Sequence, residues 1–180
     1  MIDSDQQVLA EDRRWMRYAL GLAATAFDKG EVPIGAVVVL NGEIIGEGYN
    51  QPIESIDPTA HAEVVALRDA AKRKNNYRLP GACVYVTVEP CTMCVGALIQ
   101  ARIERLVIGA PEPKTGAVFS QAQLLDSPAH NHRIVVTSGV REALCRDLMT
   151  TFFQAKRKPK ESSSVDPCAD HRQNPRETDE

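Results

Sequence analysis

Two short stretches of the sequence carry side chains that can bind a metal ion. The first is His61-Ala62-Glu63, and the second is Pro90-Cys91-Thr92-Met93-Cys94. Two cysteine thiolates one helical turn apart can reach the same ion, and an imidazole supplies a third ligand. Structural zinc sites close with four protein ligands, whereas catalytic sites keep the fourth position for water. We therefore expect His61, Cys91 and Cys94 to hold one catalytic zinc ion.

Glu63 follows His61 closely, so we expect its carboxylate beside the water that completes the zinc site. Two thiolates cancel the charge of Zn²⁺, which makes the ion a weaker Lewis acid than zinc held by three histidines. We infer that the zinc-bound water needs a base to deprotonate it. Glu63 would accept this proton and return it to the substrate, as a general base and then a general acid.

The cysteine pair has two other interpretations. A Cys91-x-x-Cys94 spacing at a strand–helix junction is also found in thiol redox proteins. A zinc-stapled binding module without turnover would use the same residues, but it favours a fourth ligand and has no need of Glu63. Cys83 and Cys145 have no comparable pattern, and we expect both to pack in the core.

These residues lie in a chain whose hydrophobic periodicity alternates between helix and strand. Asn41-Gly42 separates two apolar strands and predicts a tight hairpin. Asp57-Pro58 suits the start of the helix that carries Glu63, and Pro90 precedes the helix with the cysteines. Strands interleaved with helices predict an α/β fold, a three-layer α/β/α sandwich with a mixed central sheet. We expect helices over residues 11–28, 60–74, 91–101 and 140–158, and strands over residues 34–40, 44–49, 83–88, 105–110 and 134–137.

The 180 residues predict a flexible N-terminus over 1–10, one catalytic domain over 11–158 and a disordered polar tail over 159–180. A net charge of -3 excludes a uniformly basic surface but permits a local basic patch. Five cysteines, an odd number at irregular spacing, argue against a disulfide framework. No segment reaches the ~20 apolar residues of a membrane span. We therefore expect the protein in a reducing cytoplasm, with no membrane partner.

The stretches HAE and PCTMC together resemble the signature of zinc deaminases that act on cytosine and adenine bases. Further stretches resemble the bacterial tRNA-specific adenosine deaminases, and they follow one another from about Trp15 to Lys158. These stretches are EVPIGAVVV, HAEVVALRDA, NYRL, YVTVEPCTMC, RIERLVIGA, KTGAV, NHRI and FFQAKRK. The resemblance covers nearly the whole chain outside its two ends.

This resemblance implies the cytidine-deaminase-like fold and a homodimer. It also implies hydrolytic deamination of the wobble adenosine to inosine in the anticodon loop of an arginine tRNA. The positions that match the zinc ligands and the proton carrier of the family are His61, Cys91, Cys94 and Glu63. Asn50 matches the family asparagine that contacts the target base.

The sequence departs from this family at Pro111-Glu112, where an Arg-Asp or Asp-Asp pair is common. Near the C-terminal end, an aromatic residue could bracket an unstacked base, and basic residues could hold phosphates. Without the resemblance, the same residues fit a core aromatic and a solvated helix end equally well. Besides Asn50, the candidates for substrate contact are Ala62, Glu112, Phe153, Lys156 and Arg157.

One alternative function uses the same zinc scaffold. A free-base or nucleoside deaminase for guanine, cytosine or cytidine would need the same ligands and the same proton carrier. The extended resemblance favours tRNA, and the acidic net charge weighs mildly against it. Release of ammonia from any base would separate both deaminases from a binding module.

The polar composition of residues 159–180 generates a first prediction. This stretch has no apolar periodicity with which to bury surface. Truncation after Lys160 should therefore leave the zinc content and the melting temperature nearly unchanged. Metal analysis and thermal unfolding of the truncated and full-length proteins measure both quantities. A large drop in either one would show that the stretch packs on the domain.

Overall fold

The computed structural model describes residues 4–157. The helices are α1 (Ser4–Asp28), α2 (Pro52–Ser55), α3 (Ala62–Lys74), α4 (Thr92–Ala101) and α5 (Glu142–Arg157), with a short 3-10 helix over Leu124–Asp126. The strands are β1 (Gly35–Leu40), β2 (Glu43–Tyr49), β3 (Cys83–Val88), β4 (Arg105–Ala110) and β5 (Val135–Thr137). They form one sheet in the order β2-β1-β3-β4-β5. Strand β1 runs antiparallel to both of its neighbours, and β3, β4 and β5 run parallel.

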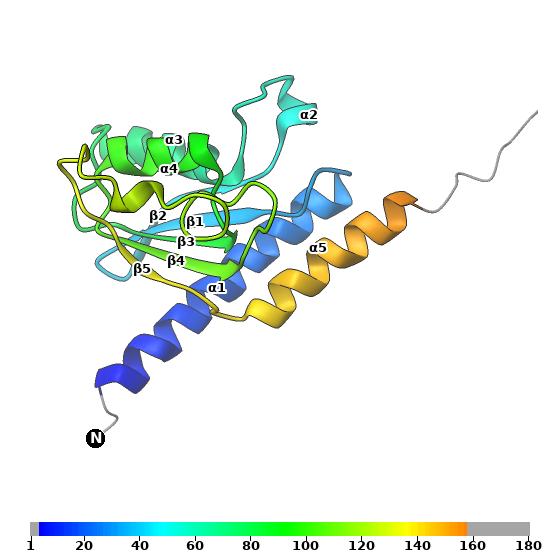
Figure 1. Ribbon diagram of the computed structural model, residues 1–180, viewed down its shortest axis with the longest axis horizontal. Coiled ribbons are helices and arrows are strands. Elements are labelled where there is room, and N and C mark those ends of the chain that lie inside the picture. Colours follow the sequence, from blue (N-terminus) through cyan, green and yellow to red (C-terminus); the bar gives the residue numbers. More distant parts are fainter. Residues whose placement is uncertain (1–3, 158–180) are drawn as a thin grey trace, which may run out of the picture.

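Helices cover both faces of the sheet. Figure 1 shows α3 and α4 on one face and α1 and α5 on the other. The core has two parts, one beneath α3 and α4 around Val84 and Leu98, and one beneath α1 and α5 around Met16 and Val107. The expected three-layer α/β/α sandwich with a mixed sheet is confirmed. Among the described residues, no helix is both long and apolar enough to cross a bilayer.

The β1–β2 hairpin brings α3 close to the sheet. Asn41 and Gly42 have left-handed backbone, with φ of 53° and 76°, as the expected hairpin turn requires. Further along β2, Gly46 and Gly48 face α3 directly. A Cβ atom would lie 2.5 Å from the α3 backbone at Gly46 and 2.6 Å from it at Gly48. The absence of these side chains therefore lets the first turn of α3, which carries Glu63, sit against the sheet.

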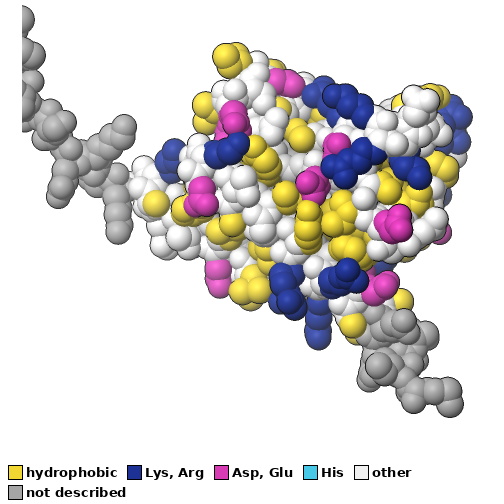
Figure 2. Space-filling model, turned by 180° about the vertical axis from the view of Figure 1, so that it is seen from behind, with side chains coloured by type: hydrophobic (Ala, Val, Ile, Leu, Met, Phe, Trp, Pro, Cys, Tyr) yellow, Lys and Arg dark blue, Asp and Glu magenta, His cyan; other side chains and the backbone are white. Residues whose placement is uncertain are grey.

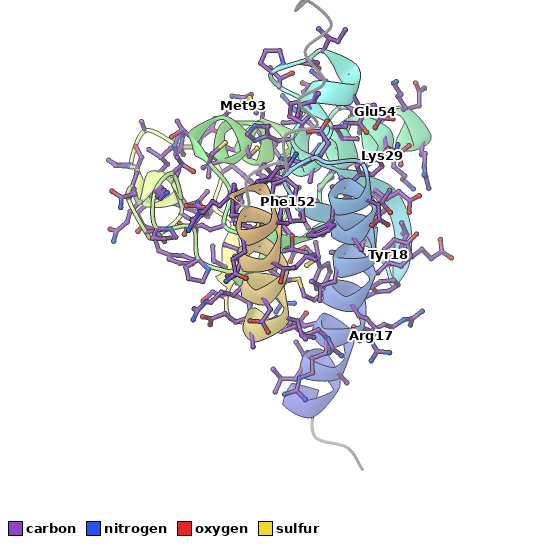
Figure 3. The ribbon with its side chains drawn as sticks, turned by 90° about the vertical axis from the view of Figure 1, so that its right-hand side faces the viewer. Arg17, Tyr18, Lys29, Glu54, Met93 and Phe152 are labelled. Carbon is purple, nitrogen blue, oxygen red and sulfur yellow. The ribbon has the colours of Figure 1, made fainter. Side chains whose placement is uncertain are left out.

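A buried charge and an aromatic contact anchor the opposite layer. The buried carboxylate of Asp12 on α1 accepts two hydrogen bonds from Arg105, both of 2.7 Å, and one from the Tyr85 hydroxyl at 3.1 Å. Near the other end of α1, Phe27 packs edge-on against Phe152 of α5 at a centroid distance of 5.6 Å. Figure 3 shows the two helices side by side with Phe152 between them. Helix α5 is thus held on the face of the sheet over β3 and β4, with its C-terminal half near the ends of both strands.

Helix α1 begins earlier than the sequence predicts. It starts at Ser4, so most of the segment expected to be a flexible N-terminus, residues 1–10, is helical. This part of the chain is rich in residues with high helix propensity. Its apolar side chains, Val8 and Leu9, are about half exposed and therefore leave no amphipathic pattern. The expected polar tail lies outside the described residues.

The segment between β2 and α3 also differs from expectation. Helix α3 begins at Ala62, and Asp57 is not its cap. The Asp57 carboxylate instead accepts hydrogen bonds from the backbone N–H and the hydroxyl of Thr59, at 2.8 and 2.7 Å, and closes a local turn. The short helix α2 was not expected. It is held by the carboxylate of Glu31, which accepts two of its backbone N–H bonds at 2.8 Å each.

The Asp12 carboxylate generates a stability prediction. Asp12→Ala leaves the Arg105 side chain, 24% exposed, without its anionic partner. Because Arg105 keeps some contact with water, we expect the free energy of unfolding to fall by about 3 kcal/mol, the lower end for broken buried pairs. Urea denaturation measures this loss. Arg146→Ala, which breaks the exposed pair with Glu142, should cost at most about 1 kcal/mol. Equal losses in the two variants would contradict this role of Asp12.

Candidate metal centre

Two helix N-termini meet at one edge of the sheet and carry the chemical residues. His61 is the N-cap residue of α3, and Cys91 is the N-cap residue of α4. Both have extended backbone, and neither side chain caps its own helix. Their side chains are therefore free for other partners. The positive end of a helix dipole also favours the thiolate form of a cysteine located there.

Three ligand atoms converge at this point. The Sγ atoms of Cys91 and Cys94 are 3.7 Å apart, and each lies 3.6 Å from Nδ1 of His61. Tetrahedral zinc at its usual bond lengths separates two thiolates by ~3.8 Å, and a thiolate from an imidazole nitrogen by ~3.6 Å. The spacing of this donor set therefore fits zinc. Within residues 4–157, it is the one group of three His, Cys, Asp or Glu side chains arranged in this way.

The two thiols influence each other's protonation. A hydrogen bond with Cys94 lowers the pKa of Cys91 to about 5, and nearby backbone N–H groups contribute further. The same hydrogen bond, together with burial, raises the pKa of Cys94. On their own, the two sulfurs therefore share one proton and carry one negative charge. A divalent cation displaces that proton, so that both sulfurs can act as thiolate ligands.

Glu63 lies in the first turn of α3, beside the donor set. The residue is 3% exposed, and burial raises the pKa of its carboxyl to about 7. The neighbouring charge of Cys91 also raises this pKa, whereas that of His61 lowers it. A carboxyl with a pKa near neutrality can both accept and release a proton. The centre thus combines three metal ligands, the number typical of catalytic zinc, with a proton carrier.

Asn50 joins the centre from the end of β2. Its side chain is buried, and its Oδ1 accepts a hydrogen bond from the backbone N–H of Ala62 at 3.0 Å. The amide oxygen therefore holds the start of α3, and the NH₂ group is the part that can donate to a ligand. The side chain of Ala62 is fully buried in the core, so only its backbone could contact a substrate.

Most of the other candidates surround a cavity of about 560 Å³ between α5 and the segment after β4. Glu112, Phe153 and Arg157 line this cavity. Lys114 and Arg146, which the sequence analysis missed, line it as well. Phe153 is 41% exposed, so part of its ring is available for stacking. Three cations and one aromatic face thus share a single cavity.

Lys156 lies apart from this group. Its ammonium is 5.3 Å from the ring centroid of Phe152, on the side of α5 that faces α1, close to Gly30. Successive residues of a helix point about 100° apart, which separates Lys156 from Arg157. The expected contact between Lys156 and a substrate stays a prediction that this geometry does not favour.

Glu89 is the other residue that the sequence analysis missed. It is buried just after β3, and its carboxylate accepts hydrogen bonds from the segment after β4. Burial on its own would raise the pKa of this carboxyl, but the Ser120 hydroxyl and backbone N–H groups bring it below its usual value. Its partners lie 23 to 31 residues further along the chain, so no local pattern could identify it.

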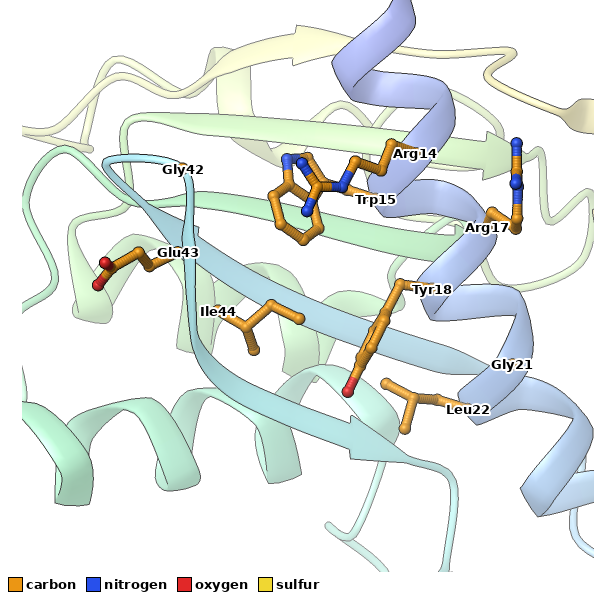
Figure 4. Close-up of a pocket in the computed structure, with 9 residues that line it drawn as sticks. All are labelled: Arg14, Trp15, Arg17, Tyr18, Gly21, Leu22, Gly42, Glu43 and Ile44. Carbon is orange, nitrogen blue, oxygen red and sulfur yellow. The ribbon is translucent and has the colours of Figure 1, made fainter.

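A larger cavity, of about 720 Å³, lies away from the metal ligands. Figure 4 shows it between α1 and the β1–β2 hairpin, with Tyr18, Leu22 and Ile44 on its walls. Arg14 stacks on the ring of Trp15 at its border, 4.4 Å from the ring centroid. Its walls are mainly apolar and contain no His or Cys, so it has no imidazole or thiolate with which to bind a metal ion.

Charged side chains of both signs are mixed on the rear face of the molecule. Figure 2 shows Lys and Arg side chains on the rear face interspersed with acidic and hydrophobic ones. A nucleic-acid backbone binds best where cations cluster. The cavity with Lys114, Arg146 and Arg157 is therefore the better site for phosphate groups.

Sequence comparison supports this interpretation of the centre. Residues 9–110 match the cytidine and deoxycytidylate deaminase zinc-binding region. The tRNA-specific adenosine deaminase of Haemophilus influenzae is 51% identical over 150 residues, which cover 83% of this chain and 87% of that protein. The tRNA-specific adenosine deaminase of Bacillus subtilis is 41% identical over 155 residues, which cover 86% of this chain and 96% of that protein.

Solved structures share the fold. One from studies of A-to-I editing by tRNA:A34 deaminases superposes with a TM-score of 0.73 at 44% identity, covering 75% of this chain and 98% of that chain. A guanine deaminase from Nitrosomonas europaea superposes with a TM-score of 0.68 at 22% identity, covering 78% of this chain and 83% of that chain. At that identity, the second likeness concerns the fold alone.

The donor set predicts zinc in the purified protein. Replacing both Cys91 and Cys94 by alanine leaves one of the three ligands, so we expect this double variant to lose its zinc. Elemental analysis of the folded protein measures the metal content. Cys145→Ala removes a buried cysteine outside the centre and should keep its zinc. Full zinc retention in the double variant would disprove the ligand assignment.

Proposed function

This chain belongs to the tRNA-specific adenosine deaminases of the cytidine and deoxycytidylate deaminase family, and we propose that it converts the wobble adenosine of a tRNA anticodon loop to inosine. The observation that carries this proposal is the zinc-fitting donor set with the buried carboxyl of Glu63 beside it. Two tRNA-specific adenosine deaminases align with 83% and 86% of the chain, at 51% and 41% identity, and this similarity supports tRNA as the substrate.

The proposed reaction replaces an amine by a water oxygen. His61, Cys91 and Cys94 would hold the zinc ion, which would supply a Lewis acid that lowers the pKa of water. Glu63 accepts one proton as the water oxygen bonds to C6 of adenine, and passes this proton to N1 of the ring. The same carboxyl then carries the second water proton to the exocyclic amine. The C6–N bond breaks, ammonia leaves and the new oxygen becomes the carbonyl of inosine.

Asn50 and the cavity residues account for the choice of substrate. The free NH₂ group of Asn50 is oriented by its bond to the start of α3 and can donate to the target base. An anticodon-loop base is already partly unstacked, so extruding it costs little. Phe153 offers a ring for a flanking base, and the cations of the cavity offer partners for phosphates.

Three finer points belong to the same proposal. We propose one zinc ion per chain, because the described residues hold one donor set. An arginine tRNA as substrate follows from the resemblance of the sequence to its family. A reducing cytoplasm fits the four cysteines of the described residues, all of which are unpaired.

We also propose a homodimer. A groove of about 280 Å³ runs between α3 and α4, with Leu67, Ala97 and Ala101 among its lining residues. Tyr77 borders this groove with 67% of its surface exposed. An exposed aromatic beside an apolar groove is typical of a protein contact surface. This supports the outer face of α3 and α4 as the contact between two copies.

Glu63→Gln tests the proton carrier. Glutamine keeps the size of the side chain but cannot carry the proton, so zinc content and folding should remain. We expect inosine formation to fall by at least the ~10²–10⁴-fold typical of a lost general acid or base. Steady-state kinetics on an anticodon stem-loop measure the change. A variant within tenfold of the wild-type rate would remove Glu63 from the mechanism.

The cavity cations predict salt-dependent RNA binding. Each single-strand phosphate contact adds ~0.7 to the slope of log affinity against log salt. Arg146→Ala/Arg157→Ala should therefore weaken stem-loop binding and flatten this slope by about 1.4, with zinc unchanged. Lys72→Ala/Lys74→Ala removes two exposed cations from the far end of α3 and serves as the control.

The choice between tRNA and free bases has its own test. Free adenosine, guanine and cytidine lack the flanking nucleotides that the cavity would hold. We expect each to be a far poorer substrate than an anticodon stem-loop, as measured by kcat/KM. Faster turnover of free guanine or cytidine would replace the tRNA proposal with a free-base or nucleoside deaminase.

A further inference from the structure

Glu89 is a buried carboxylate without a cationic partner in the part of the chain that the structure describes. It follows β3 and lies just before Pro90 and the proposed zinc ligand Cys91. None of the ion pairs within residues 4–157 includes it. A buried charge is costly unless hydrogen-bond donors compensate it. The hydrogen-bond donors around Glu89 therefore identify the segment that its charge holds in place.

All of the groups that donate hydrogen bonds to the Glu89 side chain come from one segment, residues 111–120, which follows β4. Its Oε1 accepts backbone N–H bonds from Val118, Phe119 and Ser120, at 3.1, 2.8 and 2.9 Å. Its Oε2 accepts the N–H of Glu112 at 3.0 Å and also the hydroxyl of Ser120. One carboxylate thus holds both ends of the 111–120 loop.

The 111–120 loop is also attached to the turn that carries the zinc ligand. Gly116 pairs with Cys91 in an isolated β-bridge, and the N–H of Ala117 donates to the carbonyl of Pro90 at 2.9 Å. A side chain at Gly116 would collide with the carboxylate of Glu89. The loop, Glu89 and the ligand turn therefore pack as one unit.

Residues 111–114 of this loop reach the cavity that we propose for RNA. Glu112 and Lys114 line it, opposite Phe153 and Arg157 of α5. The N–H of Glu112 is held by Glu89, and the Glu112 carboxylate accepts the N–H of Lys114 at 2.9 Å. Two successive hydrogen bonds therefore link Glu89 to Glu112 and Glu112 to Lys114.

We propose that Glu89 is a positioning residue that sets the distance between the metal centre and the RNA-facing residues of the 111–120 loop. The proposal rests on the proposed function, because it assigns the loop to RNA. It also explains why a carboxylate stands here. Both carboxylate oxygens only accept hydrogen bonds, whereas an amide would direct an N–H at one of the N–H groups of the loop.

Glu89→Gln is the corresponding experiment. The single amide oxygen of the glutamine can accept the three N–H groups at residues 118–120. Its NH₂ group then points toward the N–H of Glu112, and the hydrogen bond to that N–H is lost. We expect amide hydrogen exchange at Glu112 and Lys114 to accelerate about tenfold, with α3, α4 and zinc content unchanged. On an anticodon stem-loop, we expect KM to rise about tenfold while kcat changes by less than about threefold.

Two further variants separate positioning from general damage. Ser120→Ala removes the hydroxyl contact and leaves the four backbone donors, so KM should change by less than about threefold. In a Glu112→Ala/Lys114→Ala background, Glu89→Gln should add little to KM, because the residues that it positions are already gone. Additive effects together with loss of zinc would indicate general structural damage and overturn the proposal.

The exchange and kinetic measurements judge different parts of the inference. Unchanged exchange at Glu112 overturns the positioning role, whatever the substrate of the enzyme. Faster exchange with unchanged KM, or a fall in kcat alone, overturns the link to RNA. If the wild-type protein forms no inosine in the stem-loop, the proposed function fails with the RNA link, and the exchange data still decide whether Glu89 holds the loop.

Discussion

Three ligand atoms that lie within 4.8 Å of one another constrain the rest of this fold. They come from two helix starts that are separated by 30 residues in the sequence, yet metal bonds tolerate errors of only about 0.2 Å. The sheet meets this demand because β2 and β3 lead toward the same edge, where α3 and α4 begin. Gly46 and Gly48 let α3 approach β2 without intervening side chains, so His61 and Glu63 are held by backbone packing.

Because α3 and α4 bring their first turns together, the two cysteine thiolates and the Glu63 carboxyl lie beside the same metal ion. Two thiolates neutralise a divalent cation, which weakens its pull on a water molecule. Burial opposes this weakness by raising the pKa of Glu63, which makes its carboxylate a stronger base toward that water molecule. On the other face of the sheet, Asp12 and Phe27 fix the helical layer, and this fixes the rim of the cavity where Phe153 lies.

The metal ligands could be predicted from the sequence because they form short local patterns. The residues around them could not, because their contacts are with segments far away in the sequence. The histidine, the cysteine pair and the hairpin each form a short pattern, and apolar runs predicted all five strands. Glu89 and Glu31 act on segments more than 20 residues away, so neither they nor α2 had a local signal. Which of Lys156 and Arg157 faces the cavity depends on the rotation of α5, which its packing against Phe27 determines. Helix α1 extends beyond its apolar stripe because residues with high helix propensity precede that stripe, although Val8 and Leu9 are about half exposed.

A single-turnover reaction in water enriched in oxygen-18 tests the central claim most directly. That claim is that a water molecule, deprotonated by Glu63 at the centre formed by His61, Cys91 and Cys94, replaces the amine of the wobble adenosine. Mass analysis of ribonuclease fragments from the treated tRNA should find inosine at the wobble position alone, with one solvent-derived oxygen-18 in its base, and an equal amount of ammonia should be released. Unlabelled inosine, inosine spread over other adenosines, or tRNA that stays unchanged would contradict the account.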